Sequence, residues 1–268
     1  MVMGVLYNAN VAPAVSEEFE WTDSPLGTLL VARAFPPLSH GWTTRQLELH
    51  GGPEREQRGW DRVAAAAGLR PDQLVRLRQV HGAAVFVADH EVTPDRPEAD
   101  IVVTARADVV VAVQVADCAP VLLASRSGAV AGAAHAGWRG TAADVSGVAV
   151  RALVERFAVD AASLSAAIGP AIGPCCYEVG EELLSAFAER GWDEADRNRW
   201  FIRRDGRLFL DVWQANADQL RNAGIPGDQI HVSRLCTSCH PEWFYSYRRE
   251  GAGTGRLAAF IRPRPPHA

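Results

Sequence analysis

A single α+β domain with mixed sheets is the fold class that this sequence predicts. The chain has 268 residues, and 48% of them are hydrophobic, which is enough for one sizeable core. Strand-like runs of β-branched and small residues are interspersed with segments whose apolar residues recur at helical spacing. No repeat, linker or low-complexity tract divides the sequence. We therefore expect one domain over residues 1–268, with an irregular N-terminal extension over 1–39.

The first half of the chain predicts one helix followed by several strands. Residues 1–40 contain four prolines, which favour irregular structure. REQRGWDRVAAAAGL predicts a helix from Arg55 to near Gly68, and residues 75–89 are strand-like on both sides of His81-Gly82. From Asp108, DVVVAVQVADCAPVLLASRSGAVAGAAHAG is a series of strands broken by turn residues.

The second half predicts three helices and further strands. Residues 141–158 have apolar residues at helical spacing, with Thr141 as the expected cap. Residues 164–190 predict a strand, a Gly-Pro loop and a helix, and residues 208–225 predict a strand that leads into a helix. IHVSRL and RLAAFI are expected to be closing strands.

Composition excludes several classes of function. The net charge of −5 gives no reason to expect nucleic acid or a membrane surface as a partner, and no apolar run approaches the ~20 residues of a membrane span. The N-terminus is a poor signal peptide, so we expect a cytoplasmic protein. The sequence contains no lysine, which excludes Schiff-base and pyridoxal-phosphate enzymes and the lysine of a P-loop.

Three metal-ligating residue types lie where predicted strands end. A two-residue hairpin loop at Arg126-Ser127 would place Cys118 opposite His135, with Cβ atoms roughly 4.5–5.5 Å apart. At that distance a thiolate and an imidazole can share a metal ion or form a nucleophile–base pair. A three-residue hairpin loop would instead place the two side chains on opposite faces of the sheet. His81 also precedes a glycine at a strand end, and a third ligand would leave a metal's fourth position open for catalysis. Taken singly, a buried cysteine or a structural histidine is the more common role of such residues.

Five motifs together resemble the YfiH-like family, often labelled multicopper polyphenol oxidoreductase or laccase-domain proteins. They are RQVHG, ADCAPVLL, AAHAGWRG, IGPAIGPCCYEVG and CTSCHPEWFYSYRREGAGTGR, in family order over about residues 40–263. The resemblance implies a layered α/β/β/α fold similar to that of a cysteine-hydrolase toxin domain. It makes His81, Cys118 and His135 both the metal ligands and the catalytic residues, with zinc as the metal and copper as the alternative ion.

The resemblance also implies the substrates. Family members phosphorolyse purine nucleosides (adenosine, inosine and methylthioadenosine) and deaminate adenosine, so a nucleoside and phosphate are the expected small-molecule partners of a monomer or homodimer. The sequence departs from the family pattern in TTRQLELHGG, where a Gly-Gly/Pro-Tyr loop after Arg45 is missing and Glu48 replaces an expected asparagine. If that loop covers the substrate, specificity differs here.

Three other functions compete with the predicted nucleoside chemistry. A hydrolase that edits peptidoglycan precursors would use the same Cys/His/metal site, with Cys118 or an activated water attacking an amide. A copper-binding polyphenol oxidase is disfavoured because no two of the eight histidines form the His-X-His pairs that a copper cluster requires. A non-catalytic binding protein is the third alternative, and the presence of all three ligand residues argues against it.

Arginines and aromatics are the candidates for substrate binding. Arg139 follows the His135 strand at what reads as a helix start, a position that favours an anion. Arg248, Arg249 and Arg256 follow Phe244, Tyr245 and Tyr247, a combination that could grip phosphate and stack a purine, or could be surface arginines beside a packed aromatic strand. Arg45 and Gln79 complete the candidates, and Gln79 could equally belong to the polar face of its strand.

The pattern of the other four cysteines assigns them no clear role. Cys236 and Cys239 match the C-x-x-C-H pattern of haem attachment, which the absence of an export signal disfavours. A C-x-x-C redox motif or a zinc half-site is the alternative, and as a half-site the pair lacks a second C-x-x-C to supply four ligands. Cys175 and Cys176 are expected to be packing or loop residues, and no disulfide framework is predicted.

Overall fold

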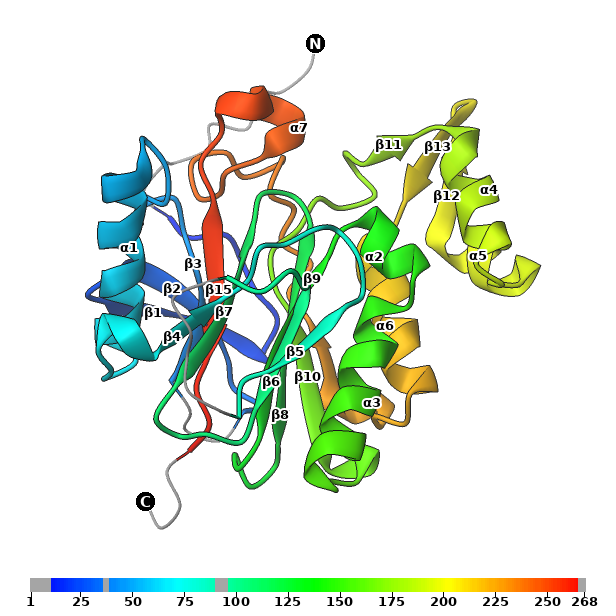
Figure 1. The fold of residues 1–268 in the computed structure, drawn as a ribbon. Coiled ribbons are helices and arrows are strands. Elements are labelled where there is room, and N and C mark those ends of the chain that lie inside the picture. The colour runs from blue at the N-terminus through cyan, green and yellow to red at the C-terminus, as the bar shows by residue number, and fades with distance from the viewer. Residues whose placement is uncertain (1–10, 36–38, 90–95, 265–268) are drawn as a thin grey trace.

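Two six-stranded mixed sheets pack face to face and carry helices on their outer sides (Figure 1). The structure is a computed structural model that describes residues 11–35, 39–89 and 96–264. Within these residues, no helix combines the length and apolarity that a membrane span requires. The predicted α+β domain with mixed sheets is confirmed. The likeness to the cysteine-hydrolase toxin fold stays a prediction.

The first sheet has the strand order β1-β2-β3-β15-β7-β4. Only β4 runs parallel to its neighbour, β7. The outer face is covered by α1 (Pro53–Ala66), which buries Trp60, Val63 and Ala64 at helical spacing and carries a proline in its first turn. The strands are β1 (Phe19–Ser24), β2 (Gly27–Ala32), β3 (His40–Thr43), β4 (Leu74–Arg76), β7 (Val110–Val115) and β15 (Leu257–Ile261).

The second sheet has the order β14-β10-β8-β9-β6-β5, with its two edge strands parallel to their neighbours. The helices α3 and α6 cover its outer face (Figure 1). The strands are β5 (Val85–Val87), β6 (Ile101–Thr104), β8 (Ala119–Ser125), β9 (Ala131–Ala136), β10 (Leu164–Ile168) and β14 (Ile230–Val232). The helices on this side are α2 (Trp138–Ala142), α3 (Val145–Phe157) and α6 (Val212–Asn222).

The main core lies between the sheets, where β7 and β15 pack on β8 and β9. Every residue of β6, β8 and β9 is buried, because one face of each strand meets the other sheet and the opposite face meets helices. The strands that carry Cys118 and His135 toward the site are therefore held on both faces.

A smaller three-stranded sheet projects from the second layer (Figure 1). Its order is β11-β13-β12, and its own apolar cluster includes Phe187 and Trp200. The elements are β11 (Glu178–Val179), α4 (Glu181–Glu189), α5 (Glu194–Trp200), β12 (Phe201–Arg204) and β13 (Arg207–Leu210), and α7 (Tyr247–Glu250) lies separately above the main sheets. Short 3₁₀ turns occupy Pro71–Gln73, Ala161–Ser163, Gly227–Gln229 and Gly251–Gly253.

The expectation of an irregular extension over residues 1–39 is wrong for its second half. Residues 19–32 form the antiparallel pair β1 and β2, whose register runs from Phe19 opposite Ala32 to Ser24 opposite Gly27. The turn between them is Pro25-Leu26, followed by Gly27 at the start of β2, so the proline that suggested irregularity lies in the hairpin loop. Pro36 and Pro37 lie outside the described residues.

Two local predictions near the site are also corrected. His135 lies opposite Pro120, not Cys118, because the hairpin loop spans residues 126–129 and Gly128 adopts a positive φ of 74° within it. The register therefore differs from the expected one by two residues, and an even shift leaves both side chains on one face. Thr141 is not a cap: it lies inside α2, whose N-cap is Gly137.

Candidate metal and substrate site

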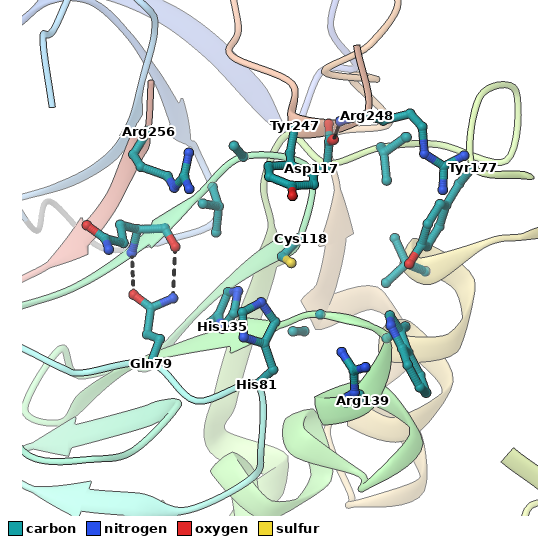
Figure 2. A pocket seen from close by; sticks show the side chains of 18 residues that line it. Gln79, His81, Asp117, Cys118, His135, Arg139, Tyr177, Tyr247, Arg248 and Arg256 are labelled. Carbon is teal, nitrogen blue, oxygen red and sulfur yellow. Dashed lines mark hydrogen bonds between the residues drawn. The ribbon is translucent and has the colours of Figure 1, made fainter. Parts of the chain in front are cut away.

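A cavity of about 620 Å³ opens where the ends of several strands meet α2 and α7 (Figure 2). Residues from both sheets contribute to its lining, together with the loop before α4 and the segment around α7. The lining residues are Gln79, His81, Gln114, Val115, Ala116, Asp117, Cys118, His135, Ala136, Gly137, Trp138, Arg139, Ile172, Tyr177, Val212, Tyr247, Arg248 and Arg256.

His81, Cys118 and His135 converge at the floor of this cavity. One ligand atom from each lies within 4.8 Å of the other two, and the two imidazole centroids are 4.7 Å apart with their planes at 78°. His135 is buried in β9, Cys118 precedes β8, and His81 is an exposed residue of the loop between β4 and β5. The structure thus brings together the three residues that the sequence singled out.

Asp100 orients this group, and the sequence analysis did not identify it. Its Oδ1 lies 2.8 Å from Nδ1 of His135, and its carboxylate accepts hydrogen bonds from the backbone N–H groups of Val80, His81 and Gly82. These bonds hold His81 at a φ of 60°, a left-handed conformation that few side chains adopt without support. The signal was present in the sequence as an acidic residue beginning an otherwise apolar strand.

The charges of the three groups are coupled. Burial alone would raise the pKa of the Cys118 thiol, but His135 and His81 overcome it and lower the pKa to about 6. Burial alone would lower the pKa of His135, whereas Cys118 and Asp100 raise it to about 9. Asp100 keeps a lowered pKa despite its burial, because it accepts hydrogen bonds from His135 and from the backbone. The lowered pKa of Cys118 and the raised pKa of His135 both favour a thiolate–imidazolium pair, and thiolate is the form that binds metals and attacks electrophiles.

The donor set fits a zinc ion. One sulfur and two imidazole nitrogens are ligands that zinc accepts, and three protein ligands leave one position for water or substrate. The contact between His135 Nδ1 and Asp100 directs the other ring nitrogen toward Cys118 and His81, which is the usual support of a ligating histidine.

The predicted substrate residues divide into two groups. Arg139 and Arg248 line the cavity, as does Arg256, which was noted beside them. The guanidinium of Arg139 stacks on Trp138 at 4.3 Å, and no carboxylate of the described residues pairs with it. Arg248 donates through Nη1 to the carbonyl of Glu178 and lies over Tyr177 at 5.3 Å.

The structure does not bring Arg45 to the cavity. Its Nη1 donates to the carbonyl of Pro241 and approaches Glu250 at 3.5 Å, and its guanidinium stacks on Tyr245. Gln79 lines the cavity, but its amide exchanges two 2.8 Å hydrogen bonds with the backbone of Gln114 (Figure 2). Both side chains therefore have structural partners, which is the alternative that the sequence left open for Gln79.

Two further residues shape the cavity wall. Asp117 has a φ of 87° and accepts a hydrogen bond from Thr237 at one oxygen and from the backbone N–H of Arg248 at the other, both at 2.6 Å. Burial, reinforced by the nearby Cys118 thiolate, raises the pKa of Tyr177, so its hydroxyl keeps its proton and can donate a hydrogen bond. These contacts join α7 to the loop that carries Cys118.

The profile of the family described as "Multi-copper polyphenol oxidoreductase laccase" matches residues 45–264 of this chain. The crystal structure of the hypothetical protein YfiH of Bacillus licheniformis superimposes with a TM-score of 0.83 at 26% identity, covering 93% of this chain and all of that one. The chain belongs to the YfiH-like family. Among relatives of this YfiH-like protein, the purine nucleoside phosphorylase of Deinococcus radiodurans is 38% identical over 235 residues, 83% of this chain and 88% of that protein. Adenosine deaminase RL5, from an unknown prokaryotic organism, is 33% identical over 207 residues, 72% and 76% of the two chains.

Proposed function

We propose that this YfiH-like protein is a zinc-dependent purine nucleoside phosphorylase that also deaminates adenosine. The observation that carries the proposal is one cavity that joins a three-ligand metal site to three arginines. The names of its relatives, one a purine nucleoside phosphorylase and one an adenosine deaminase, support the same two reactions.

His81, Cys118 and His135 would hold the zinc ion, with Asp100 supporting His135. When bound, zinc would supply a redox-silent Lewis acid at the floor of the cavity. The chain itself contributes a rigid backbone that keeps the three metal-ligand side chains in place. β9 is buried on both faces, and the Asp100 carboxylate clamps the His81 turn. A site fixed in this way needs little reorganisation when substrate arrives.

Phosphate would bind at the arginines. Arg139 lines the cavity with its guanidinium stacked on Trp138, and Arg248 and Arg256 retain N–H donors beyond those used by backbone carbonyls. In phosphorolysis, a phosphate oxygen forms a bond to C1′ of the ribose while the bond from C1′ to the purine nitrogen breaks. The electron pair leaves on the purine, which takes a proton, and the products are ribose 1-phosphate and the free base. Such an enzyme accelerates the reaction mainly by holding phosphate and nucleoside next to each other in one cavity.

Aromatic side chains would receive the purine. Trp138, Tyr177 and Tyr247 line the cavity, and Tyr247 is 54% exposed at its rim. Rings of this kind stack on bases, and the protonated Tyr177 hydroxyl can donate to a ring nitrogen. For deamination, water adds at C6 of adenosine and ammonia leaves, so the same base position would serve both reactions.

The decisive test is release of hypoxanthine from inosine by purified protein, with and without inorganic phosphate. The proposal expects product only when phosphate is present, together with ribose 1-phosphate in equal amount. Conversion of adenosine to inosine should proceed without phosphate. Absence of both reactions across adenosine, inosine and methylthioadenosine, with zinc bound, would overturn the proposal.

One observation favours a second candidate, a hydrolase of peptidoglycan precursors. The lowered pKa of Cys118 beside an imidazolium is the arrangement of an activated cysteine nucleophile. A muropeptide-precursor panel run beside the nucleoside panel separates the two functions, because amide cleavage by a cysteine requires no phosphate.

A further inference from the structure

A cluster of four thiols lies apart from the His81/Cys118/His135 site. Cys175, Cys176, Cys236 and Cys239 come from two loops far apart in sequence, yet their sulfur atoms all lie within 4.8 Å of one another. Sγ of Cys239 is 3.5 Å from Sγ of Cys175 and 3.5 Å from Sγ of Cys176. In a tetrahedral Zn(Cys)₄ site with Zn–S bonds of about 2.3 Å, neighbouring sulfurs are about 3.8 Å apart. The four sulfurs are thus already near the spacing of a zinc site.

The backbone of both loops is organised around these sulfurs. An isolated parallel bridge pairs Ala171 with Cys236 and sets the loops side by side. Cys236 then turns the chain, since its carbonyl accepts from the N–H groups of Cys239 and His240, both at 3.2 Å. In the facing loop, the carbonyl of Gly173 accepts from the N–H of Cys176 at 2.9 Å.

One hydrogen bond in the cluster is directed at sulfur itself. The backbone N–H of Gly173 donates to Sγ of Cys236 at 3.3 Å, and Cys236 is buried. A donated N–H group stabilises negative charge on sulfur, and such outer contacts orient ligands in metal sites. Cys175 and Cys239 are exposed, so an ion could reach the cluster from solvent.

We propose that Cys175, Cys176, Cys236 and Cys239 bind one zinc ion in a closed, structural site. Four sulfurs fill the tetrahedral coordination and leave no position for water, so this ion would take no part in the chemistry of the cavity. The vicinal pair Cys175-Cys176 supplies the two ligands that the sequence pattern lacked when only Cys236 and Cys239 were counted.

The position of the cluster indicates what the ion would hold in place. Cys176 is followed by Tyr177 of the cavity wall. Thr237, between the other two ligands, donates to Asp117, which in turn accepts from the backbone of Arg248. Joining the two loops would therefore fix Tyr177 and α7 relative to Cys118. The metal-binding proposal is independent of the reaction that the cavity catalyses.

The test is zinc content of the full-length protein, purified under reducing conditions and equilibrated with zinc. Cys118→Ala is the matched control, because Cys118 is the fifth cysteine and belongs to the other group. We expect about two zinc ions per chain in the wild type and about one each in Cys118→Ala and Cys239→Ser, with none in the double variant. Cobalt bound to Cys118→Ala should show intense sulfur-to-metal charge-transfer absorption that Cys239→Ser in the same background lacks.

A second measurement covers the case in which Cys239→Ser does not fold. In the wild-type protein, zinc should protect the four cysteines from alkylation, and a chelator should expose them, as read by peptide mass mapping. Two results would overturn the proposal: Cys118→Ala that holds no zinc under these conditions, or a disulfide from Cys239 to Cys175 or Cys176 in protein kept under reducing conditions.

Discussion

Gly137 shows at the scale of a single residue why small side chains surround the His81/Cys118/His135 cluster. A Cβ at this position would lie 3.0 Å from Sγ of Cys118 and 3.1 Å from Cδ2 of His81. Both distances are tighter than ordinary van der Waals contact, and neither neighbour can move without leaving the ligand cluster. Glycine at position 137 therefore lets Cys118 and His81 lie as close to this backbone as they do.

Gly137→Ala should displace Cys118 and His81 and weaken zinc binding at least about 10-fold. This is the loss in metal affinity that follows when a residue supporting a metal ligand is mutated. Competition with a fluorescent chelator measures the affinity. Gly253→Ala is the matched control, because a Cβ there meets no atom within 4 Å. Unchanged affinity in Gly137→Ala would show that the cluster is looser than these contacts indicate.

Cys118→Ala should remove a ligand and, with it, the activity of the cavity. Loss of a hydrogen-bond partner of a metal ligand alone costs about 10–100-fold in metal affinity. Loss of the ligating sulfur itself should cost more, so turnover of inosine, which needs the bound metal, should fall by more than about 100-fold. The residue is only partly buried, so the free energy of unfolding should fall by about 1 kcal/mol. Hypoxanthine release and thermal melting measure the two effects, and full activity in this variant would remove Cys118 from the mechanism.

Arg139→Ala should separate the two proposed reactions. Loss of one anion-binding donor costs on the order of 10²–10³ in rate when the anion reacts, so phosphorolysis should fall by that factor. Deamination uses no phosphate and should change much less, and zinc should stay bound. Parallel assays of inosine and adenosine give the comparison. Equal loss of both activities with a lowered melting temperature would mean that Arg139 supports the fold through its stacking on Trp138.

At the scale of elements, the sequence predicted the strands and helices of the centre better than the contacts that build the site. The apolar runs around Val110–Val115 and Ala131–Ala136 identify their strands, because buried strands need little beyond such residues. The hairpin register depended on a loop length that Ser and Gly leave ambiguous, and it was wrong by two residues. The expected pairing of Cys118 with His135 is therefore wrong, but the two side chains still lie on one face because an even shift preserves the face.

Long-range contacts explain the rest of what the sequence did not predict. Asp100 approaches His135 only because β6 pairs with β9. The four cysteines gather because two distant loops meet at the bridge between Ala171 and Cys236. Spacing along the chain could not reveal either contact, and the one local signal was that an acidic residue, Asp100, precedes an apolar strand. The hairpin of β1 and β2 was missed for a different reason, since its one proline, Pro25, lies in the turn between the two strands.

The edge strand β14 carries a buried histidine that should make stability depend on pH. Burial lowers the pKa of His231 below its ordinary 6.5, against the weaker opposing effects of Glu18 and Asp228. Its Nε2 is buried and has no partner among the described residues. A group with a lowered folded-state pKa stabilises the fold above its unfolded pKa, and that stability is lost as pH falls through the folded value.

His231→Phe should therefore lose less stability than the wild type between pH 7 and pH 5. Urea unfolding across this range, taken as the difference between the two proteins, gives the contribution of His231 alone. Asp228→Asn, which removes a carboxylate that opposes the shift, should enlarge the loss on acidification. A difference that does not vary with pH would show that His231 titrates alike in the folded and unfolded chains.

At the scale of the whole molecule, the cavity is a cationic region on a chain of net charge −5. Arg139, Arg248 and Arg256 line it, whereas Asp117 is its one lining carboxylate among the described residues and is already bonded to Thr237 and Arg248. The site also draws residues from both sheets, so an anion that binds there contacts groups fixed by the whole core. The electric field of the three arginines in the cavity, and not the net charge of the chain, would therefore attract phosphate.

The distribution of histidines over the whole chain argues against oxidase chemistry. Reducing oxygen to water by four electrons needs several coppers, with paired histidine ligands to hold them, and none of the eight histidines forms a His-X-His pair. Within the described residues, the groups able to hold a metal are the His81/Cys118/His135 site and the four-cysteine cluster.

After loading with copper, the protein should therefore consume oxygen with a phenol substrate no faster than the same amount of free copper, as an oxygen electrode would record. Cys118→Ala loaded in the same way controls for adventitious copper. Sustained oxygen uptake that depends on Cys118, with water as the product, would mean that the laccase description of the family applies to this chain after all.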